Sequence, residues 1–480
     1  MYVYTFEESK ADQYIESVAG RNKVLEWNGA NGFVDFRTKA PLLPNQTLES
    51  TLSFLKTGNE LNRRLLVIKD ASELLETKPV VALLKEIARK IRAGDGGIDA
   101  SVIVVSSTLR IPQELEKMIT VLELDFPDEK AISDIIARFM RDNGIPAVHA
   151  GLLEGMSRAF KGLSEFEIED LLRLAISEDG ELTGKALKLI FDQKQQMILK
   201  AGILEMIPLK ESIDDIGGLE NLKDWLRKKA GVFGNIKTAM EFGVAMPKGV
   251  LIAGMPGCGK SLTAKAAGKL FDVPLLRLDM GRLMGKYVGE SEENMRKAIR
   301  LAEAISPCVL WVDELEKAFA GIGGGGGSEV TTRLFGAFLT WLQEKTSSAF
   351  VVATANDITQ LPPELLRKGR FDEIFYVPLP SPDEREMIFK IHIGKRRKQD
   401  LQNVDIGALV SQTDGYTGAD IEGVVSESVE SVFVGGKAAL ATEDVSASIT
   451  NTHSLSEIMK DSLESMDKLY KDRKFKKASR

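Results

Sequence analysis

Cysteine and histidine are scarce in this sequence, with two cysteines and three histidines among 480 residues. Cys258 and Cys308 are too few for a disulfide framework, so we expect a reducing compartment. No H-E-x-x-H sequence occurs, which excludes a zinc protease of the common type. No apolar run approaches the roughly 18 residues of a membrane-spanning helix. The start of the chain also lacks the basic and apolar regions of a secretory signal.

An excess of positive charge is also absent. The formal net charge is −7 and the isoelectric point is about 5.5, so there is no overall basic field for nucleic acid. The hydrophobic content of 44% and the charged content of 28% are ordinary for a soluble globular protein. A chain of this length is expected to form roughly two to four domains.

The most informative feature that is present is the octapeptide GMPGCGKS, which fills every fixed position of the phosphate loop G-x-x-x-x-G-K-[ST]. An apolar run (249–253) precedes it and a helix-prone run (262–270) follows it, as this motif requires. Backbone N–H groups would then face a polyphosphate. Lys260 would reach the β and γ phosphates, and the Ser261 hydroxyl would bind Mg²⁺. The predicted nucleotide contacts in this segment are Gly254, Met255, Pro256, Gly257, Cys258, Gly259, Lys260, Ser261 and Leu262.

Apolar segments alternate with amphipathic segments around this motif, which predicts an α/β fold. Buried apolar strands joined through helices form a parallel sheet covered on both faces, with ligands at the carboxyl ends of the strands. From about residue 383 the pattern is helical only, which predicts a small helical lid. The expected domains are residues 1–200, 201–382 and 383–480. A parallel five-stranded sheet is predicted from the apolar segments at 249–253, 273–278, 307–314, 350–356 and 375–377.

The first 200 residues repeat the second half in weakened form. Strands at 65–70 and 101–106 would stand where the strands ending near Asp313 and Asn356 stand later. This half has no phosphate loop and keeps one carboxylate, Asp70, where the second half has two. We therefore predict a degenerate copy of the fold that cannot hydrolyse nucleotide, with chance similarity between helices as the alternative. Three blocks recur in order at offsets of about 250 residues: 111–115 with 361–365, 126–132 with 380–388, and 162–169 with 415–422.

Hydrolysis of a phosphoanhydride needs charge neutralisation, a positioned water and a group that senses the γ-phosphate. Asp313, at the end of an apolar strand, can hold Mg²⁺, and Glu314 can polarise the attacking water. Asn356, at the end of the next strand, can bond the water or the γ-phosphate, although a role as a turn cap is the alternative. Arg367 and Arg370 are spaced by three and are expected on one edge of a short helix, facing outward. An arginine given to a neighbouring subunit can raise the rate ~10³–10⁵-fold, whereas a surface salt bridge is the alternative.

In this order, the motifs from residue 213 to about 432 resemble an AAA-type ATPase module, a branch of the ring-forming P-loop ATPases that remodels proteins. The resemblance rests on DDIGG at 214–218, the phosphate loop, VDE, ATAN, the two arginines, and the segments KIH and GYTGAD near 392 and 415. It implies ATP and Mg²⁺ as cofactors and a homo-oligomer, usually a hexamer, whose arginines reach across the subunit boundary. It also places His392, Gly418 and Ala419 against the adenosine, and Gly217 by the adenine.

A narrower resemblance rests on GAFLTWLQEK (336–345) and LPPELLRKGRFDEI (361–374). Both segments are similar to AAA proteins encoded as hypothetical open reading frames in algal plastids and cyanobacteria, which implies a cytoplasmic or stromal location. One segment departs from the wider pattern. Most protein-remodelling AAA modules have LLxxMDG where this chain has LTWLQE at 339–344, which puts the usual coupling between neighbouring subunits in doubt.

The resemblance also identifies Tyr287 and Val288 as pore residues that would grip an extended polypeptide, with a surface-packed tyrosine as the alternative. The glycine run 323–327 predicts a loop without the charge or aromatic groups for nucleic-acid contact. The basic C-terminal tail (468–480) could contact phosphate groups, but a solvated helix end is the more common meaning of such a segment.

Three functions remain open. The chain could be an ATP-driven motor that remodels an unknown protein client, an ATPase linked to nucleic acid, or a nucleotide-switched scaffold. The composition argues against nucleic acid. Stimulation of ATP turnover by unfolded protein, by DNA or RNA, or by neither distinguishes the three.

Overall fold

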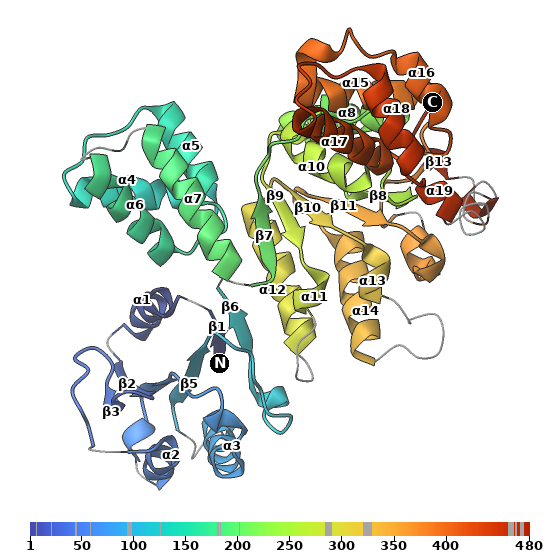
Figure 1. The fold of residues 1–480 in the computed structure, drawn as a ribbon. Coiled ribbons are helices and arrows are strands. Elements are labelled where there is room, and N and C mark those ends of the chain that lie inside the picture. Colours follow the sequence, from blue (N-terminus) through green and yellow to red (C-terminus); the bar gives the residue numbers. More distant parts are fainter. Residues whose placement is uncertain are drawn as a thin grey trace. The chain divides into compact units, whose positions relative to one another are not determined.

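The computed structural model of the chain forms two compact units, residues 1–187 and 188–480, and each is described by itself (Figure 1). No helix in the described part of the chain is long and apolar enough to cross a membrane. Cys258 and Cys308 are buried as thiols and do not form a disulfide. The structure describes all residues except 6, 21, 44–45, 58, 94–97, 125, 180–181, 183, 201, 284–289, 320–328, 368, 459–464, 466–467 and 471–474.

The first unit is built on a six-stranded sheet in the order β3-β2-β4-β5-β1-β6. All neighbouring strands are parallel except β2 and β3, which form an antiparallel hairpin. Apolar side chains cover both faces, since helix α1 packs on one and helices α2 and α3 pack on the other. The strands are β1 (Tyr2–Tyr4), β2 (Lys23–Asn28), β3 (Gly32–Asp35), β4 (Arg64–Ile68), β5 (Ala100–Ser106) and β6 (Val121–Glu123).

A helical group follows this sheet in the chain. Helix α4 packs against α5 and α6, and its first turn is capped by the Asp128 side chain, which accepts a hydrogen bond from Ala131 N. The helices are α1 (Glu8–Ala19), α2 (Leu48–Thr57), α3 (Lys78–Arg92), α4 (Glu129–Asp142), α5 (Ala150–Phe160), α6 (Glu165–Asp179) and α7 (Gly184–Lys200), the last of which spans the division between the units.

The second unit contains a seven-stranded sheet in the order β13-β12-β8-β11-β10-β9-β7. Its five central strands are the five predicted ones, and they are parallel as predicted. The sequence did not predict the two edge strands, β7 antiparallel to β9 and β13 parallel to β12. The strands are β7 (Leu204–Ile207), β8 (Gly249–Gly254), β9 (Leu275–Leu278), β10 (Cys308–Val312), β11 (Ala349–Ala355), β12 (Glu373–Val377) and β13 (Lys476–Lys477).

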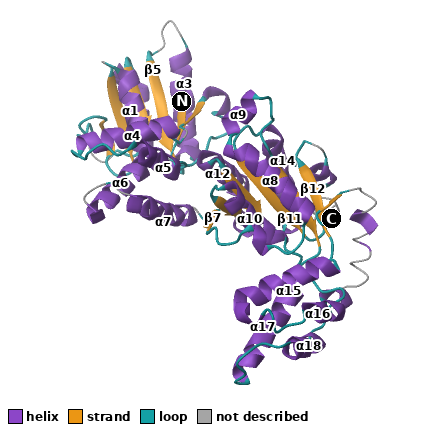
Figure 2. Ribbon diagram, turned by 90° about the horizontal axis from the view of Figure 1, so that it is seen from above, coloured by secondary structure: helices purple, strands orange, loops and turns teal. Residues whose placement is uncertain are grey.

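Helices cover both faces of this sheet. Helices α12 and α14 pack on one face, and α8 and α10 pack on the other. Helices α15 to α18 form the predicted helical lid, which Figure 2 shows as a separate group beside the sheet. The helices are α8 (Glu220–Gly234), α9 (Ile236–Glu241), α10 (Lys260–Phe271), α11 (Met280–Leu283), α12 (Glu290–Ile305), α13 (Leu315–Phe319), α14 (Glu329–Glu344), α15 (Pro382–Arg397), α16 (Ile406–Gln412), α17 (Gly418–Val434), α18 (Thr442–Asn451) and α19 (Leu455–Ile458).

The two sheets share one topology, which confirms the predicted second copy of the fold. Strands β6-β1-β5-β4-β2 of the first unit follow the same spatial and chain order as β12-β8-β11-β10-β9 of the second. An antiparallel strand lies beyond the last of these in each unit. The helical groups also correspond, because Ser164 and Glu167 cap α6 as Thr417 and Asp420 cap α17.

The C-terminal tail differs from the solvated helix end that the sequence favoured. Strand β13 pairs with β12, Tyr470 is buried against the ring of Tyr376 at a centroid distance of 4.0 Å, and Ala478 is fully buried. The carbonyl of Ala478 accepts a hydrogen bond from Leu222 N, an N–H group in the first turn of α8. Such groups have no partner within their own helix, so the tail supplies one.

Candidate nucleotide-binding site

The phosphate loop joins β8 to α10 at the carboxyl end of the sheet. Gly257 and Gly259 have φ values of +73° and +85°, which disfavour other residues. A Cβ on Gly257 would also lie 2.7 Å from Thr417 Oγ1 in the lid. Helix α10 begins at Lys260, so its first N–H groups and the positive end of its dipole favour an anion at the loop.

Lys260 is 6% exposed and is folded back onto the loop. Its Nζ donates to the carbonyl oxygens of Gly254 at 2.9 Å and Met255 at 2.6 Å. Burial lowers the pKa of Lys260 to about 8, and nearby carboxylates offset only part of this effect. A phosphate would replace these neutral acceptors with an anionic one, which favours the charged ammonium.

Three oxygen-bearing side chains meet where β10 ends beside α10. Asp313 Oδ1 accepts hydrogen bonds from Ser261 Oγ at 3.1 Å and from Thr354 Oγ1 at 2.5 Å. Hydroxyl and carboxylate oxygens are the ligands that Mg²⁺ prefers. Ser261 and Asp313 therefore fit the metal role predicted for them, and Thr354 orients the carboxylate.

Glu314 follows with a φ of +50°, an unusual conformation for a residue with a side chain and one that is found often at functional sites. Its backbone N–H donates to Thr354 Oγ1 at 3.1 Å. Its Oε1 accepts from Asn356 Nδ2 at 3.4 Å, and its Oε2 lies 2.7 Å from Lys317 Nζ. The two neighbouring carboxylates thus have different partners, Ser261 and Thr354 for Asp313 and Asn356 and Lys317 for Glu314, which allows the two groups different roles.

Asn356 is placed by Glu316, a buried residue whose function the sequence did not predict. The backbone N–H of Asn356 donates to Glu316 Oε1 at 3.1 Å, and burial raises the pKa of Glu316. The turn after β11 is capped by Asp357, whose side chain accepts from Thr359 N. The Asn356 amide is thus held beside Glu314 and not used as the cap of that turn.

The lid forms the other wall of the site. Ala419 N, in the first turn of α17, donates to the carbonyl of Gly257 at 3.0 Å. His392 on α15 lies with Nδ1 3.8 Å from a Glu422 carboxylate oxygen and 3.5 Å from Arg396 Nη1. Burial lowers the pKa of His392, so its ring is neutral at pH 7. In the phosphate loop, burial raises the pKa of Cys258 to about 12, so it remains a thiol.

These segments enclose a pocket of about 490 Å³. Among the predicted contacts of the phosphate loop, Gly254 and Met255 are not part of its lining. The predicted residues that do line it are Gly217, Pro256, Gly257, Cys258, Gly259, Lys260, Ser261, Leu262, Asp313, Glu314, Asn356, His392, Gly418 and Ala419. The lining residues that the sequence did not predict are Asp215, Ile216, Leu219, Thr354, Pro378, Pro380, Glu384, Ile388, Ile391 and Glu422.

The two arginines lie outside this lining, and their predicted helix is wrong. The short 3-10 helix Pro363–Leu366 ends before Arg367, whose backbone is extended. Gly369 then turns the chain with a φ of +96°, so the arginines do not share a helix edge. Arg367 is exposed, whereas Arg370 is half-buried. Tyr287, Val288 and the glycine run 323–327 fall outside the described residues.

Comparison with known proteins identifies matching families for segments of both units. Residues 250–379 match "ATPase family associated with various cellular activities (AAA)", and residues 403–434 match "AAA+ lid domain". Residues 1–124 and 130–201 match the N-terminal and second domains of "SpoVK-like AAA ATPase". The chain is 35% identical to "Uncharacterized AAA domain-containing protein ycf46" of Pyropia yezoensis, over 99% of this chain and 96% of the relative. It is 37% identical to the protein of the same name from Guillardia theta, over 90% of this chain and 85% of the relative.

The chain belongs to the AAA family of ATPases. The resemblance expected from the motifs, including the narrower one, is therefore confirmed. A more distant similarity extends to "Cell division cycle protein 48 homolog" of Archaeoglobus fulgidus, which is 38% identical over 45% of this chain and 29% of the relative. The AAA domain implies that the chain binds ATP.

The first unit of this AAA protein has a different arrangement at the corresponding position. Strand β1 ends at Tyr4 and α1 begins at Glu8, which leaves three chain positions against five between β8 and α10, and the sequence there does not contain the phosphate-loop motif. Lys69 follows β4 as Asp313 follows β10, and Asp70 has a φ of +53° where Glu314 has +50°. A lysine thus stands where the second unit has its predicted metal ligand.

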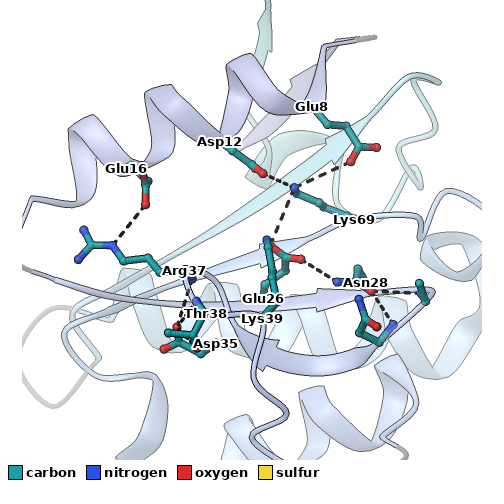
Figure 3. A network of polar contacts seen from close by, with 12 residues as sticks. Glu8, Asp12, Glu16, Glu26, Asn28, Asp35, Arg37, Thr38, Lys39 and Lys69 are labelled. Atoms are coloured by element: carbon teal, nitrogen blue, oxygen red, sulfur yellow. Dashed lines mark hydrogen bonds and ion pairs between the residues drawn. The ribbon is translucent and has the colours of Figure 1, made fainter.

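Figure 3 shows the ion pairs around this lysine. Lys69 Nζ lies 2.7 Å from Asp12 Oδ2 and 3.9 Å from oxygens of Glu8 and Glu26. Glu26 is 1% exposed, and it also accepts from Lys39 Nζ at 2.5 Å and Asn28 Nδ2 at 2.7 Å. The ammonium of Lys69 provides a positive charge within the chain at this position.

Proposed function

We propose that the chain hydrolyses ATP at the pocket of the second unit. The observation that supports this proposal is the convergence of Lys260, Ser261, Asp313, Glu314 and Asn356 from a loop and two strand ends onto one pocket wall. These are the groups that phosphoanhydride hydrolysis requires, namely a phosphate-binding cation, metal ligands, a base and a γ-phosphate sensor.

Each residue has a distinct task in this proposal. Lys260 leaves its two carbonyl acceptors and binds the β and γ phosphates. Ser261 and Asp313 would hold Mg²⁺, which would supply charge neutralisation at the phosphates. Glu314 accepts a proton from the attacking water, and Asn356 orients that water or the γ-phosphate.

The adenosine is assigned to the wall formed by the lid. The pocket extends between the 215–219 segment and α15 to the beginning of α17. Gly217, His392, Gly418 and Ala419 all line this pocket. A neutral His392 suits an uncharged nucleoside better than an imidazolium would, because burial disfavours the charged ring.

We further propose that hydrolysis drives the remodelling of a protein client by a ring of subunits. The similarity to the archaeal cell division cycle protein 48 homolog and the exposed Arg367 support this proposal. Arg367 and Arg370 would act on the nucleotide of the next subunit, and Tyr287 with Val288 would line the pore. The chain has no excess of positive charge that would favour nucleic acid as the client.

The ATPase proposal is tested by phosphate release from the purified chain and its Glu314→Gln variant. The variant should bind ATP with Mg²⁺ but lose at least ~10²-fold in turnover, because the base is gone while the binding groups remain. Glu241→Gln is the matched control, since Glu241 is exposed at the end of α9 and does not line the pocket. Turnover by Glu314→Gln at the wild-type rate would show that the assignment is wrong.

The remodelling proposal needs a second measurement, in which unfolded protein and nucleic acid are compared as activators. Acceleration by an unfolded polypeptide supports a protein motor. Acceleration by DNA or RNA alone, or by neither, contradicts it. Capture of proteins by the Glu314→Gln variant in ATP would then identify the client, since this variant should retain what the wild type releases.

A further inference from the structure

Beside the nucleotide pocket, the loop that precedes α8 packs closely against the lid helix α15. We call residues 212–219 the glycine-pair loop, after Gly217 and Gly218. A Cβ on Gly217 would lie 2.5 Å from Ile388 Cγ1 on α15, and a Cβ on Gly218 would lie 2.3 Å from Glu384 Oε1. Gly218 also has a φ of +76°. The backbone of this loop therefore lies directly against the first turns of the lid helix.

Glu384 joins the two elements through both oxygens of its carboxylate. Its Oε1 accepts from Leu219 N at 3.0 Å, and its Oε2 accepts from Ser381 N, also at 3.0 Å. The first bond crosses from the lid to the glycine-pair loop, and the second belongs to the capping box that starts α15. Glu384 is 8% exposed and lines the pocket. A buried carboxylate with two N–H donors is fixed in position.

A second contact joins the glycine-pair loop to the other end of α15. Lys395 Nζ, near the end of α15, lies 2.7 Å from Asp215 Oδ1 in the loop, and this bond lowers the pKa of Asp215. Lys223 Nζ donates to the carbonyl of Ile216 at 2.7 Å and holds the loop from its other side. The loop is thus held at both ends against α15.

We propose that Glu384 is a positioning residue for the nucleotide, which sets the distance between the glycine-pair loop and the lid helix. The proposal rests on the nucleotide site proposed above. The loop contributes Ile216, Gly217 and Leu219 to the pocket lining, and α15 contributes Ile388 and His392. A nucleoside in this pocket meets both elements at fixed positions only while Leu219 stays bonded to the lid. Glu384 therefore acts on nucleotide binding and not on the hydrolytic step.

The test compares Glu384→Gln with the wild-type chain in binding and in turnover. A glutamine has one acceptor oxygen, so its amide NH₂ opposes one of the two N–H donors. We expect Kd and KM for ATP to rise roughly tenfold, which is the loss of about one hydrogen bond to a charged group. The kcat at saturating ATP should stay within about twofold, because the groups at the γ-phosphate are unchanged.

Two control variants separate this effect from a weaker helix start. Ser381→Ala removes the Oγ half of the capping box but keeps the Ser381 backbone N–H, so Glu384 still joins it to Leu219. Glu386→Gln removes a carboxylate two residues along α15 that is paired with Lys390 on the exposed face. Both should lower the melting temperature slightly or not at all and leave KM within twofold of the wild type.

The outcomes are distinct. A raised KM with an unchanged kcat in Glu384→Gln alone supports the proposal. An unchanged KM in Glu384→Gln, a loss confined to kcat, or an equal rise in KM for Ser381→Ala would overturn it. If the wild-type chain itself binds no ATP in the presence of Mg²⁺, the proposed function fails first, and that result is recognised before any variant is compared.

Discussion

Replacing Lys69 by methionine tests how far the first unit depends on the ion pairs at the position that corresponds to Asp313 of the second unit. The substitution keeps the length of the side chain but leaves Asp12 without its partner at 2.7 Å. It also removes one of the two ammonium groups near Glu26, which is 1% exposed. Breaking a buried ion pair costs ~3–5 kcal/mol. Because Asp12 is partly exposed and Glu26 keeps Lys39 and Asn28, we expect a loss of about 2–3 kcal/mol in the free energy of unfolding.

The assay must report on the first unit alone, because a chain of two units need not unfold in one step. Native-state hydrogen exchange does so, since peptides from β2 and β4 report on the first unit and peptides from β8 and β11 report on the second. Lys69→Met should reduce protection in the first set and leave the second unchanged. The control is Lys85→Met, which breaks the exposed pair with Glu114 and should cost below about 1 kcal/mol.

A double variant adds a test of the physical cause. Glu26→Gln combined with Lys69→Met removes the buried anion together with its cation, so it should be less destabilised than the sum of the two single variants. If Lys69→Met lies within about 0.5 kcal/mol of the wild type, or if the two changes are simply additive, the reasoning about charge compensation is refuted.

Two further predictions concern the second unit. Burial lowers the pKa of Lys345 from 10.5 to about 8, so the folded state loses this proton before the unfolded state does, and stability should rise by about 2 kcal/mol between pH 7.5 and 10 relative to Lys345→Met. The prediction is contradicted if the free energies of unfolding of the wild type and Lys345→Met change with pH by the same amount. Ala478→Asp places a carboxylate in a fully buried position and should release the tail, at a cost of about 2 kcal/mol or more. Hydrogen exchange should then rise in β12 and the first turn of α8, whereas Lys477→Asp, at an exposed position of β13, should leave it unchanged.

The central sheet could be predicted from sequence because each strand is a short apolar run with turn residues beside it. Strand β8 is buried along its whole length, as are β10 and β11, so their composition reports burial directly. The edge strand β13 carries no such signal. Strand β13 is two exposed lysines, and it exists because β12 offers unpaired backbone groups and Tyr470 and Ala478 find buried positions beside it. The helix expected for Arg367 and Arg370 is absent because the 3-10 helix ends at Leu366, and the positive φ of Gly369, which cannot be deduced from spacing, then turns the chain.

The candidate site could be predicted only in part, for a similar reason. Lys260 and Ser261 belong to a local motif, and Glu314 follows an apolar strand, so each is marked by its neighbours in the chain. Thr354 and Glu384 have no such neighbours, since they act through contacts with Asp313 and Leu219 that the fold brings together. One sign was available for Thr354, which is near the end of β11, two residues before Asn356.

The two sheets differ in how the charge of an acidic group at the same edge is balanced. In the second unit, Asp313, Glu314 and Glu316 lie near Lys260, and their charge is suited to a bound cation. In the first unit, Glu8, Asp12 and Glu26 form a similar acidic group, and Lys69 supplies the cation from within the chain. The Lys69 ammonium is part of the chain and is present at any nucleotide concentration. A bound metal and nucleotide, in contrast, stabilise the folded protein only while they are bound. The stability of the first unit should therefore be independent of ATP, and any stabilisation by ATP should be confined to the second.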